Sequence, residues 1–188
     1  MNKQVVLSFL VLAIFFPRSV AAAPDEKSIP LEVKKAFVEA GVPVLRQRVP
    51  SVDFSAPLIS GNTQQLKALE GKVVFLNFWA SWCGPCRSEM PSMDALYRRL
   101  NDQGLEIFAV NCQETQKDVA SFMKNYNLSF PAALDLSGEI SAIYRVDAFP
   151  TTYIIDRKGE IIARVVGSVN WNTPKLVAAF ETLLKSSE

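Results

Sequence analysis

The chain has 188 residues, of which 49% are hydrophobic and 21% are charged. With 20 basic and 19 acidic residues, its net charge is +1, which gives no electrostatic basis for binding nucleic acid or an acidic surface. The sequence contains 3 cysteines and no histidine. This composition favours one ordinary globular domain and restricts the metal and catalytic sites that the chain can build.

The first segment has the layout of a secretory signal peptide. Lys3 is the only charge before the apolar run Val5–Phe16, and small residues follow as far as Ala22. An apolar run of this length is shorter than the roughly 20 residues that cross a bilayer core. We therefore expect residues 1–23 to direct export to the periplasm or another extracytoplasmic space. Arg18 keeps an uncleaved membrane tether as the alternative.

Residues 24–50 differ in composition from the rest of the chain. They contain 4 prolines around a single short helical pattern, Leu31–Ala40, which Gly41 stops. We interpret this segment as an N-terminal arm that leads into a domain spanning residues 51–188.

The remaining segments alternate between strand and helix patterns. Val73–Trp79 is apolar and rich in β-branched and aromatic residues, as expected of a strand buried on both faces. Such alternation predicts an α/β fold, with a mixed central sheet and helices on both faces. The expected elements are a hairpin with a helical turn over Val52–Gly71, strands at Val73–Trp79, Leu105–Asn111 and Ala132–Leu134, helices at Pro85–Asn101, Lys117–Tyr126, Glu139–Tyr144 and Pro174–Leu184, and a closing hairpin of Thr151–Asp156 and Ile161–Val166.

The motif Cys83-Gly84-Pro85-Cys86 follows the first of these strands. A disulfide between residues so close in sequence constrains the unfolded chain very little, so a structural staple is a poor explanation. A zinc site needs three or four protein ligands, and Cys112 is the only further thiol. Haem attachment needs a histidine directly after the second cysteine, where Arg87 stands. Thiol–disulfide exchange remains, because it needs one attacking thiolate and a second thiol nearby.

The predicted helix gives the two cysteines different roles. Cys83 lies at the helix N-terminus, where unpaired N–H groups and the helix dipole lower the pKa of a thiol, so it is the expected nucleophile. Cys86 lies one turn further along and is the expected resolving thiol. Pro85 suits the first helical turn. Glu89 shares a helix face with Cys86 and is either a proton acceptor or a solvated acidic residue of the early helix.

Longer motifs surround these cysteines. "GKVVFLNFWASWCGPCRSEMP" and the downstream "FPTTYIIDRKGEI" resemble the TlpA/ResA-like family of exported thioredoxin-fold thiol–disulfide oxidoreductases, over about residues 52–184. The resemblance implies a thioredoxin-like fold with an N-terminal β-hairpin extension and a helix–strand insertion before Pro150. It also implies a cis peptide bond at Pro150. The implied substrate-binding residues are Trp82, Gly84, Pro85, Phe149, Pro150 and Thr151.

Two positions separate this chain from other thioredoxin-fold families. Asn77 stands where cytoplasmic thioredoxins carry a buried aspartate, and Glu89 stands where the TlpA/ResA branch has a functional glutamate. Peroxidases of the peroxiredoxin kind carry Thr or Ser where this chain has Ala80. The implied catalytic residues are therefore Cys83, Cys86 and Glu89, with the cysteine pair in place of any cofactor.

The direction of exchange depends on the surroundings of the thiols. Gly84 and Pro85 separate the cysteines, and the chain has no histidine to stabilise a thiolate strongly. We therefore expect a reductant of specific protein disulfides. We also expect the protein to be a monomer. The resemblance implies recharging by a membrane-embedded thiol donor, and a client such as an apocytochrome c or a copper-site assembly protein. The alternatives are an oxidant or isomerase of the same fold, a peroxidase, and a non-catalytic client-binding module.

Four further residues receive structural interpretations. Cys112 at the end of the second strand is expected to be a small buried residue, and Trp79 to pack at the edge of the core. Trp82 is expected to form a partly exposed wall of the docking groove. Trp171 is expected to anchor the loop before the last helix.

Overall fold

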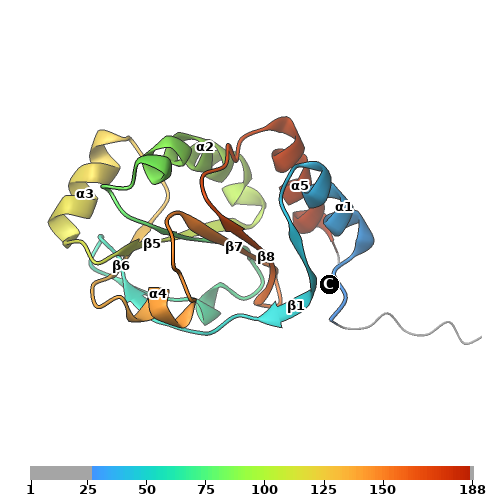
Figure 1. The fold of residues 1–188 in the computed structure, drawn as a ribbon, viewed down its shortest axis with the longest axis horizontal. Helices are drawn as coiled ribbons and strands as arrows, with labels where there is room; N and C mark the ends of the chain where they lie inside the picture. The colour runs from blue at the N-terminus through green and yellow to red at the C-terminus, as the bar shows by residue number, and fades with distance from the viewer. Residues whose placement is uncertain (1–26, 187–188) are drawn as a thin grey trace, which may run out of the picture.

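A computed structural model describes residues 27–186, and the predicted signal segment lies outside them. A six-stranded mixed sheet forms the centre, in the order β1-β8-β7-β4-β5-β6 (Figure 1). Its parallel strands are β4 to β6, and the others are antiparallel. The strands are β1 (Val44–Pro50), β4 (Val73–Trp79), β5 (Leu105–Cys112), β6 (Ala132–Asp135), β7 (Thr151–Ile155) and β8 (Glu160–Val166).

Helices cover both faces of this sheet, as the alternation of strands and helices predicted (Figure 1). One face packs against side chains of α1, α2, α3 and α5, and the other packs against α4 and a small hairpin. The helices are α1 (Leu31–Glu39), α2 (Gly84–Leu100), α3 (Gln116–Asn125), α4 (Glu139–Ile143) and α5 (Pro174–Lys185), and the short 3-10 turns are η1 (Lys67–Leu69) and η2 (Asn101–Gln103).

Strand β4 shows why the sheet needs cover on both faces. Val73, Phe75 and Trp79 point into the core beneath α2 and α5, whereas Val74, Leu76 and Phe78 point into the core on the opposite face. Alternate side chains of a strand lie on opposite faces, so an uninterrupted apolar run requires two apolar environments. The carboxyl end of β4 leads directly into the two cysteines.

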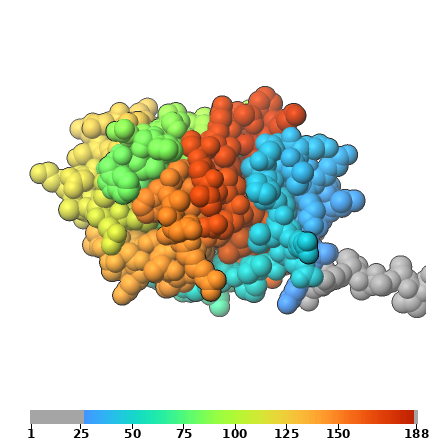
Figure 2. Space-filling view, in the orientation of Figure 1, coloured from blue at the N-terminus to red at the C-terminus, as the bar shows by residue number. Residues whose placement is uncertain are grey.

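The N-terminal segment differs from the arm that the sequence suggested. Helix α1 was expected, but β1 was not, and this strand pairs with β8 at the edge of the central sheet. Phe37 of α1 also meets Phe180 of α5 with ring centroids 5.1 Å apart. In the space-filling view this segment lies against the C-terminal part of the chain (Figure 2). Four of its seven residues are exposed and its one buried residue is Arg48, so its sequence shows no apolar alternation typical of a strand.

The expected hairpin before β4 is present as β2 (Ser55–Pro57) and β3 (Thr63–Gln65), which form a separate two-stranded sheet. α3 and β6 supply the helix and strand expected between β5 and the Pro150 segment. Between residues 27 and 186, no helix is both long enough and apolar enough to span a membrane.

Candidate active site

The two cysteines meet at the N-terminus of α2. Cys83 and Cys86 form a disulfide, and Cys83 is the N-cap of the helix, with its Sγ accepting a hydrogen bond from the backbone N–H of Cys86 at 3.1 Å. Cys83 is 5% exposed, whereas Cys86 is fully buried. A donor N–H and the helix dipole both favour negative charge on the Cys83 sulfur once the disulfide is opened.

Glu89 lies one helical turn after Cys86 and is only 1% exposed. Its Oε1 accepts a hydrogen bond from Asn77 Nδ2 at 3.0 Å. Its Oε2 accepts from the backbone N–H of Val169 at 3.2 Å and from the indole Nε1 of Trp171 at 3.1 Å. Burial raises the pKa of this carboxyl to about 7, against the lowering effect of the three hydrogen bonds. A solvated surface role for Glu89 is therefore wrong.

A shallow cavity of about 480 Å³ opens beside the disulfide. Its wall includes the exposed ring of Trp82, which meets Phe149 edge-on with ring centroids 6.0 Å apart. The peptide bond between Phe149 and Pro150 is cis, as the resemblance implied. The lining residues are Trp82, Cys83, Gly84, Pro85, Val146, Asp147, Ala148 and Phe149.

Pro150 and Thr151 lie behind this cavity rather than on its surface. Both are buried, and Thr151 Oγ1 donates to the backbone carbonyl of Ala148 at 2.7 Å. Four of the six expected substrate-binding residues thus line the cavity, while Pro150 and Thr151 shape the loop that carries Phe149.

The loop before Cys83 is held by a carboxylate that the sequence did not single out. Glu114 accepts hydrogen bonds from the backbone N–H of Ser81 and from Asn111 Nδ2, both at 2.6 Å, and from the Ser81 hydroxyl. Asn111 is the second-last residue of β5 and pairs with Trp79 of β4. These bonds attach the loop before Cys83 to the segment after β5.

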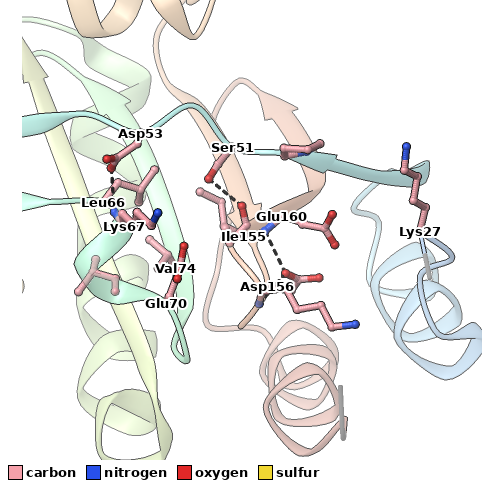
Figure 3. A pocket seen from close by; sticks show the side chains of 14 residues that line it. Lys27, Ser51, Asp53, Leu66, Lys67, Glu70, Val74, Ile155, Asp156 and Glu160 are labelled. Carbon is pink, nitrogen blue, oxygen red and sulfur yellow. Dashed lines mark hydrogen bonds between the residues drawn. The ribbon is translucent and has the colours of Figure 1, made fainter.

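A larger cavity of about 590 Å³ lies away from this chemistry. It opens near the turn between β7 and β8 and near the start of β4 (Figure 3). The disulfide lies beyond the other end of β4. Lysine and carboxylate side chains are mixed around it, among them Lys67, Asp53 and Glu70. Size alone does not make it the candidate site, because it holds neither cysteine.

Comparisons with known proteins agree with this geometry. The model of the AhpC/TSA family matches residues 46–164. The thiol–disulfide oxidoreductase ResA of Bacillus subtilis strain 168 is 35% identical over 151 residues, which cover 80% of this chain and 83% of that protein. A ResA of Bacillus cereus is 42% identical over 115 residues, 61% of this chain, and the match spans 66% of that relative, slightly less than two thirds.

The chain belongs to the AhpC/TSA family and to the ResA-like proteins within it. Among solved structures, a putative thiol:disulfide interchange protein DsbE from Chlorobium tepidum is similar, with a TM-score of 0.67 and 31% identity. That similarity covers 73% of this chain and 96% of the other. The thioredoxin-like fold expected from the motifs is therefore confirmed.

Two residues of this ResA-like site were missed or underrated from the sequence. Trp171 is buried as expected of an anchor, but it also donates to Glu89, and Glu114 holds the loop before the cysteines. A buried tryptophan N–H usually has a polar partner, which was the available signal for Trp171. Cys112 is free and buried, and burial raises its pKa to about 12.

Proposed function

We propose that this chain is an exported reductase of specific protein disulfides, in which Cys83 attacks the client and Cys86 resolves the mixed disulfide. The observation that carries the proposal is the asymmetry of the pair: Cys83 caps the helix at the edge of an open cavity, while Cys86 is fully buried one turn inward. A client sulfur reaches the first far more easily than the second. The ResA-like relatives support exchange chemistry.

In the proposed reaction the Cys83 thiolate attacks one sulfur of the client disulfide, forming a mixed disulfide and releasing a client thiolate. Cys86 then gives its proton to the Glu89 carboxylate, directly or through a water, and its thiolate attacks Cys83 Sγ. The second client sulfur leaves as a thiolate. The client gains two electrons, the cysteine pair loses two, and Glu89 passes its proton to solvent.

Several features favour reduction over oxidation. A very low nucleophile pKa, about 3.5 in strong oxidants, stabilises the reduced form of the pair and makes it oxidising. Gly84 and Pro85 add no charge between the cysteines, and Glu89, when ionised, is an anion one turn from Cys86. An anion at that distance opposes thiolate formation.

The proposed partners are a protein client and a membrane-embedded thiol donor that recharges the cysteine pair. The cavity beside the disulfide is open, with Trp82 and Phe149 as apolar contacts. Such a surface suits an unfolded or extended client segment, for example the cysteine-containing haem site of an apocytochrome c. Export rests on the sequence of residues 1–23.

A trapping experiment tests the assigned roles. The Cys86→Ser variant, reduced and mixed with an oxidised peptide containing C-x-x-C-H, should accumulate a mixed disulfide through Cys83, because no thiol remains to resolve it. The reciprocal Cys83→Ser variant should give little adduct. Mass spectrometry of the non-reduced products identifies the linked cysteine, and an adduct formed only through Cys86 would reverse the roles.

A further inference from the structure

The loop after β8 is attached along one face of α2. Ser168 Oγ lies 3.1 Å from Ser88 Oγ, and the backbone N–H of Trp171 donates to Ser92 Oγ at 3.0 Å. Between these two contacts the backbone N–H of Val169 donates to Glu89. Residues 167–171, here called the β8–α5 loop, therefore follow the turn of α2 that carries Glu89.

Trp171 is the most constrained side chain of this loop. It is fully buried, and its ring stands edge-on to Phe75 with centroids 4.7 Å apart and an interplanar angle of 86°. It also packs near Phe180, at 6.5 Å between centroids. Packing on both sides fixes the direction of the indole N–H, which ends on Glu89 Oε2 at 3.1 Å. The donor is thus pre-oriented by the core.

The Glu89 carboxyl is surrounded by donors rather than by charges. Asn77 reaches it from β4, and Val169 and Trp171 reach it from the β8–α5 loop, while Cys86 lies one turn back on α2. None of these hydrogen bonds comes from a charged side chain. The ionised form of Glu89 therefore depends on a small number of neutral N–H groups to offset its burial.

We propose that Trp171 is a positioning residue for disulfide exchange, whose buried N–H holds Glu89 as an oriented carboxylate able to take the proton of Cys86. This rests on the proposed role of Glu89. Trp171 acts on exchange through its hydrogen bond to Glu89. Trp171 lies in the β8–α5 loop, outside the cysteine motif.

Trp171→Phe tests the proposal, because it keeps an aromatic ring against Phe75 and removes only the donor. Each N–H group that donates to a carboxylate stabilises its ionised form and can lower its pKa by about one unit. We therefore expect the Glu89 pKa to rise by about one unit, measured by carbon-13 NMR titration of the oxidised protein with Glu89→Gln as the assignment reference. The midpoint pH of the acid limb in the profile of exchange rate against pH should rise by the same amount.

The chain offers a matched control. Trp79 is also fully buried, but its Nε1 has no hydrogen-bond partner among the described residues. Trp79→Phe should leave the Glu89 titration in place. In a Glu89→Gln background, Trp171→Phe should no longer move the pH profile of exchange.

A measurement on the unaltered protein guards against a variant that does not fold. The indole N–H resonance of Trp171 should titrate with the midpoint of the Glu89 carboxyl, and that of Trp79 should not. An unchanged Glu89 titration in a folded Trp171→Phe variant, or an indole resonance that ignores pH, would overturn the proposal. If Glu89→Gln itself leaves exchange unaltered, the proposed role of Glu89 fails instead, and the two failures are distinguishable.

Discussion

Glu89 is held between two opposing influences on its ionisation. Removal from water favours the neutral acid, whereas hydrogen bonds from Asn77, Val169 and Trp171 favour the carboxylate. The outcome is a pKa of about 7, so both forms are populated at neutral pH. A group in this state can accept a proton and release it again, which is the property that general acid–base catalysis requires.

The chemical role of Glu89 is testable by removing its charge. Glu89→Gln preserves the size of the side chain but cannot accept a proton, so exchange should slow by about 10²–10⁴-fold, the usual effect of losing an acid–base group. Stopped-flow reduction of the oxidised C-x-x-C-H peptide gives the rate. Glu114→Gln, which alters a carboxylate that holds the loop but lies outside the proton path, should slow exchange far less. Equal rates for Glu89→Gln and the unaltered protein would leave Glu89 without a catalytic role.

The same carboxyl should also make stability depend on pH. Because its pKa is about 4.5 in the unfolded chain and about 7 in the fold, the native state binds more protons between those values. The contribution of Glu89 to the free energy of unfolding is therefore largest below its unfolded pKa. This contribution falls as pH rises towards 7, by at most about 3 kcal/mol. Urea unfolding of the oxidised protein between pH 4 and 8 measures the slope, which Glu89→Gln should flatten. An equal slope in Glu89→Gln and the unaltered protein would show that folding does not raise the pKa of Glu89.

Features of the site that lie within one local sequence motif could be predicted, whereas contacts between distant residues could not. The spacing of Cys83 and Cys86 and the resemblance around Pro150 indicated the disulfide and the cis bond, because each lies within one local motif. The contact from Trp171 to Glu89 joins residues 82 apart in sequence. Only the fold brings the β8–α5 loop to α2, so the sequence alone could not reveal that contact.

Strand β1 carries a buried arginine, Arg48, that pairs with Asp156 and, at 3.8 Å, with Glu160 of the β7–β8 hairpin. Arg48 Nε lies 2.6 Å from Asp156 Oδ2, and the two side chains are 5% and 0% exposed. Asp156 also accepts the backbone N–H groups of Lys158 and Glu160 in the turn between β7 and β8. The pair therefore connects the edge strand to the hairpin that follows the cis proline.

Breaking this pair should destabilise the fold strongly. Arg48→Ala leaves the Asp156 carboxylate buried without its cation, which costs about 3–5 kcal/mol in comparable cases. Arg46→Ala on the same strand is the matched control, because Arg46 is exposed and should change stability by less than about 1 kcal/mol. Chemical denaturation of the two variants at neutral pH decides the matter. Similar losses in both would mean that β1 is held by its backbone pairing alone.

The strand β1 was missed in the sequence for a physical reason. The one buried position of this edge strand is Arg48, and its apolar residues are exposed or half-buried, so they do not alternate with polar ones. Strand β4, buried at every position, was predicted with its observed bounds. Sequence patterns therefore revealed the centre of the sheet and its β6 edge, but not the β1 edge.

For the molecule as a whole, the fold places the reactive disulfide at the carboxyl end of β4 and the larger cavity near its start. The cysteine pair thus stands apart from the mixed-charge cavity, next to an open apolar surface suited to protein clients. Helix α2 packs on the core of the sheet, and the residues around its N-terminus set the thiol pKa values and the reduction potential of the cysteine pair. The potential of that pair is consequently the property that decides the direction of electron flow.

The reduction potential of the Cys83–Cys86 pair tests the central claim most directly. A Cys112→Ser variant, equilibrated at pH 7 in thiol–disulfide buffers and quenched by alkylation, allows mass spectrometry to count the reduced pair without interference from the third thiol. We expect a value below about −200 mV, closer to the roughly −270 mV of a reducing thioredoxin. A value near about −120 mV, typical of a strong disulfide oxidant, would contradict a reductase.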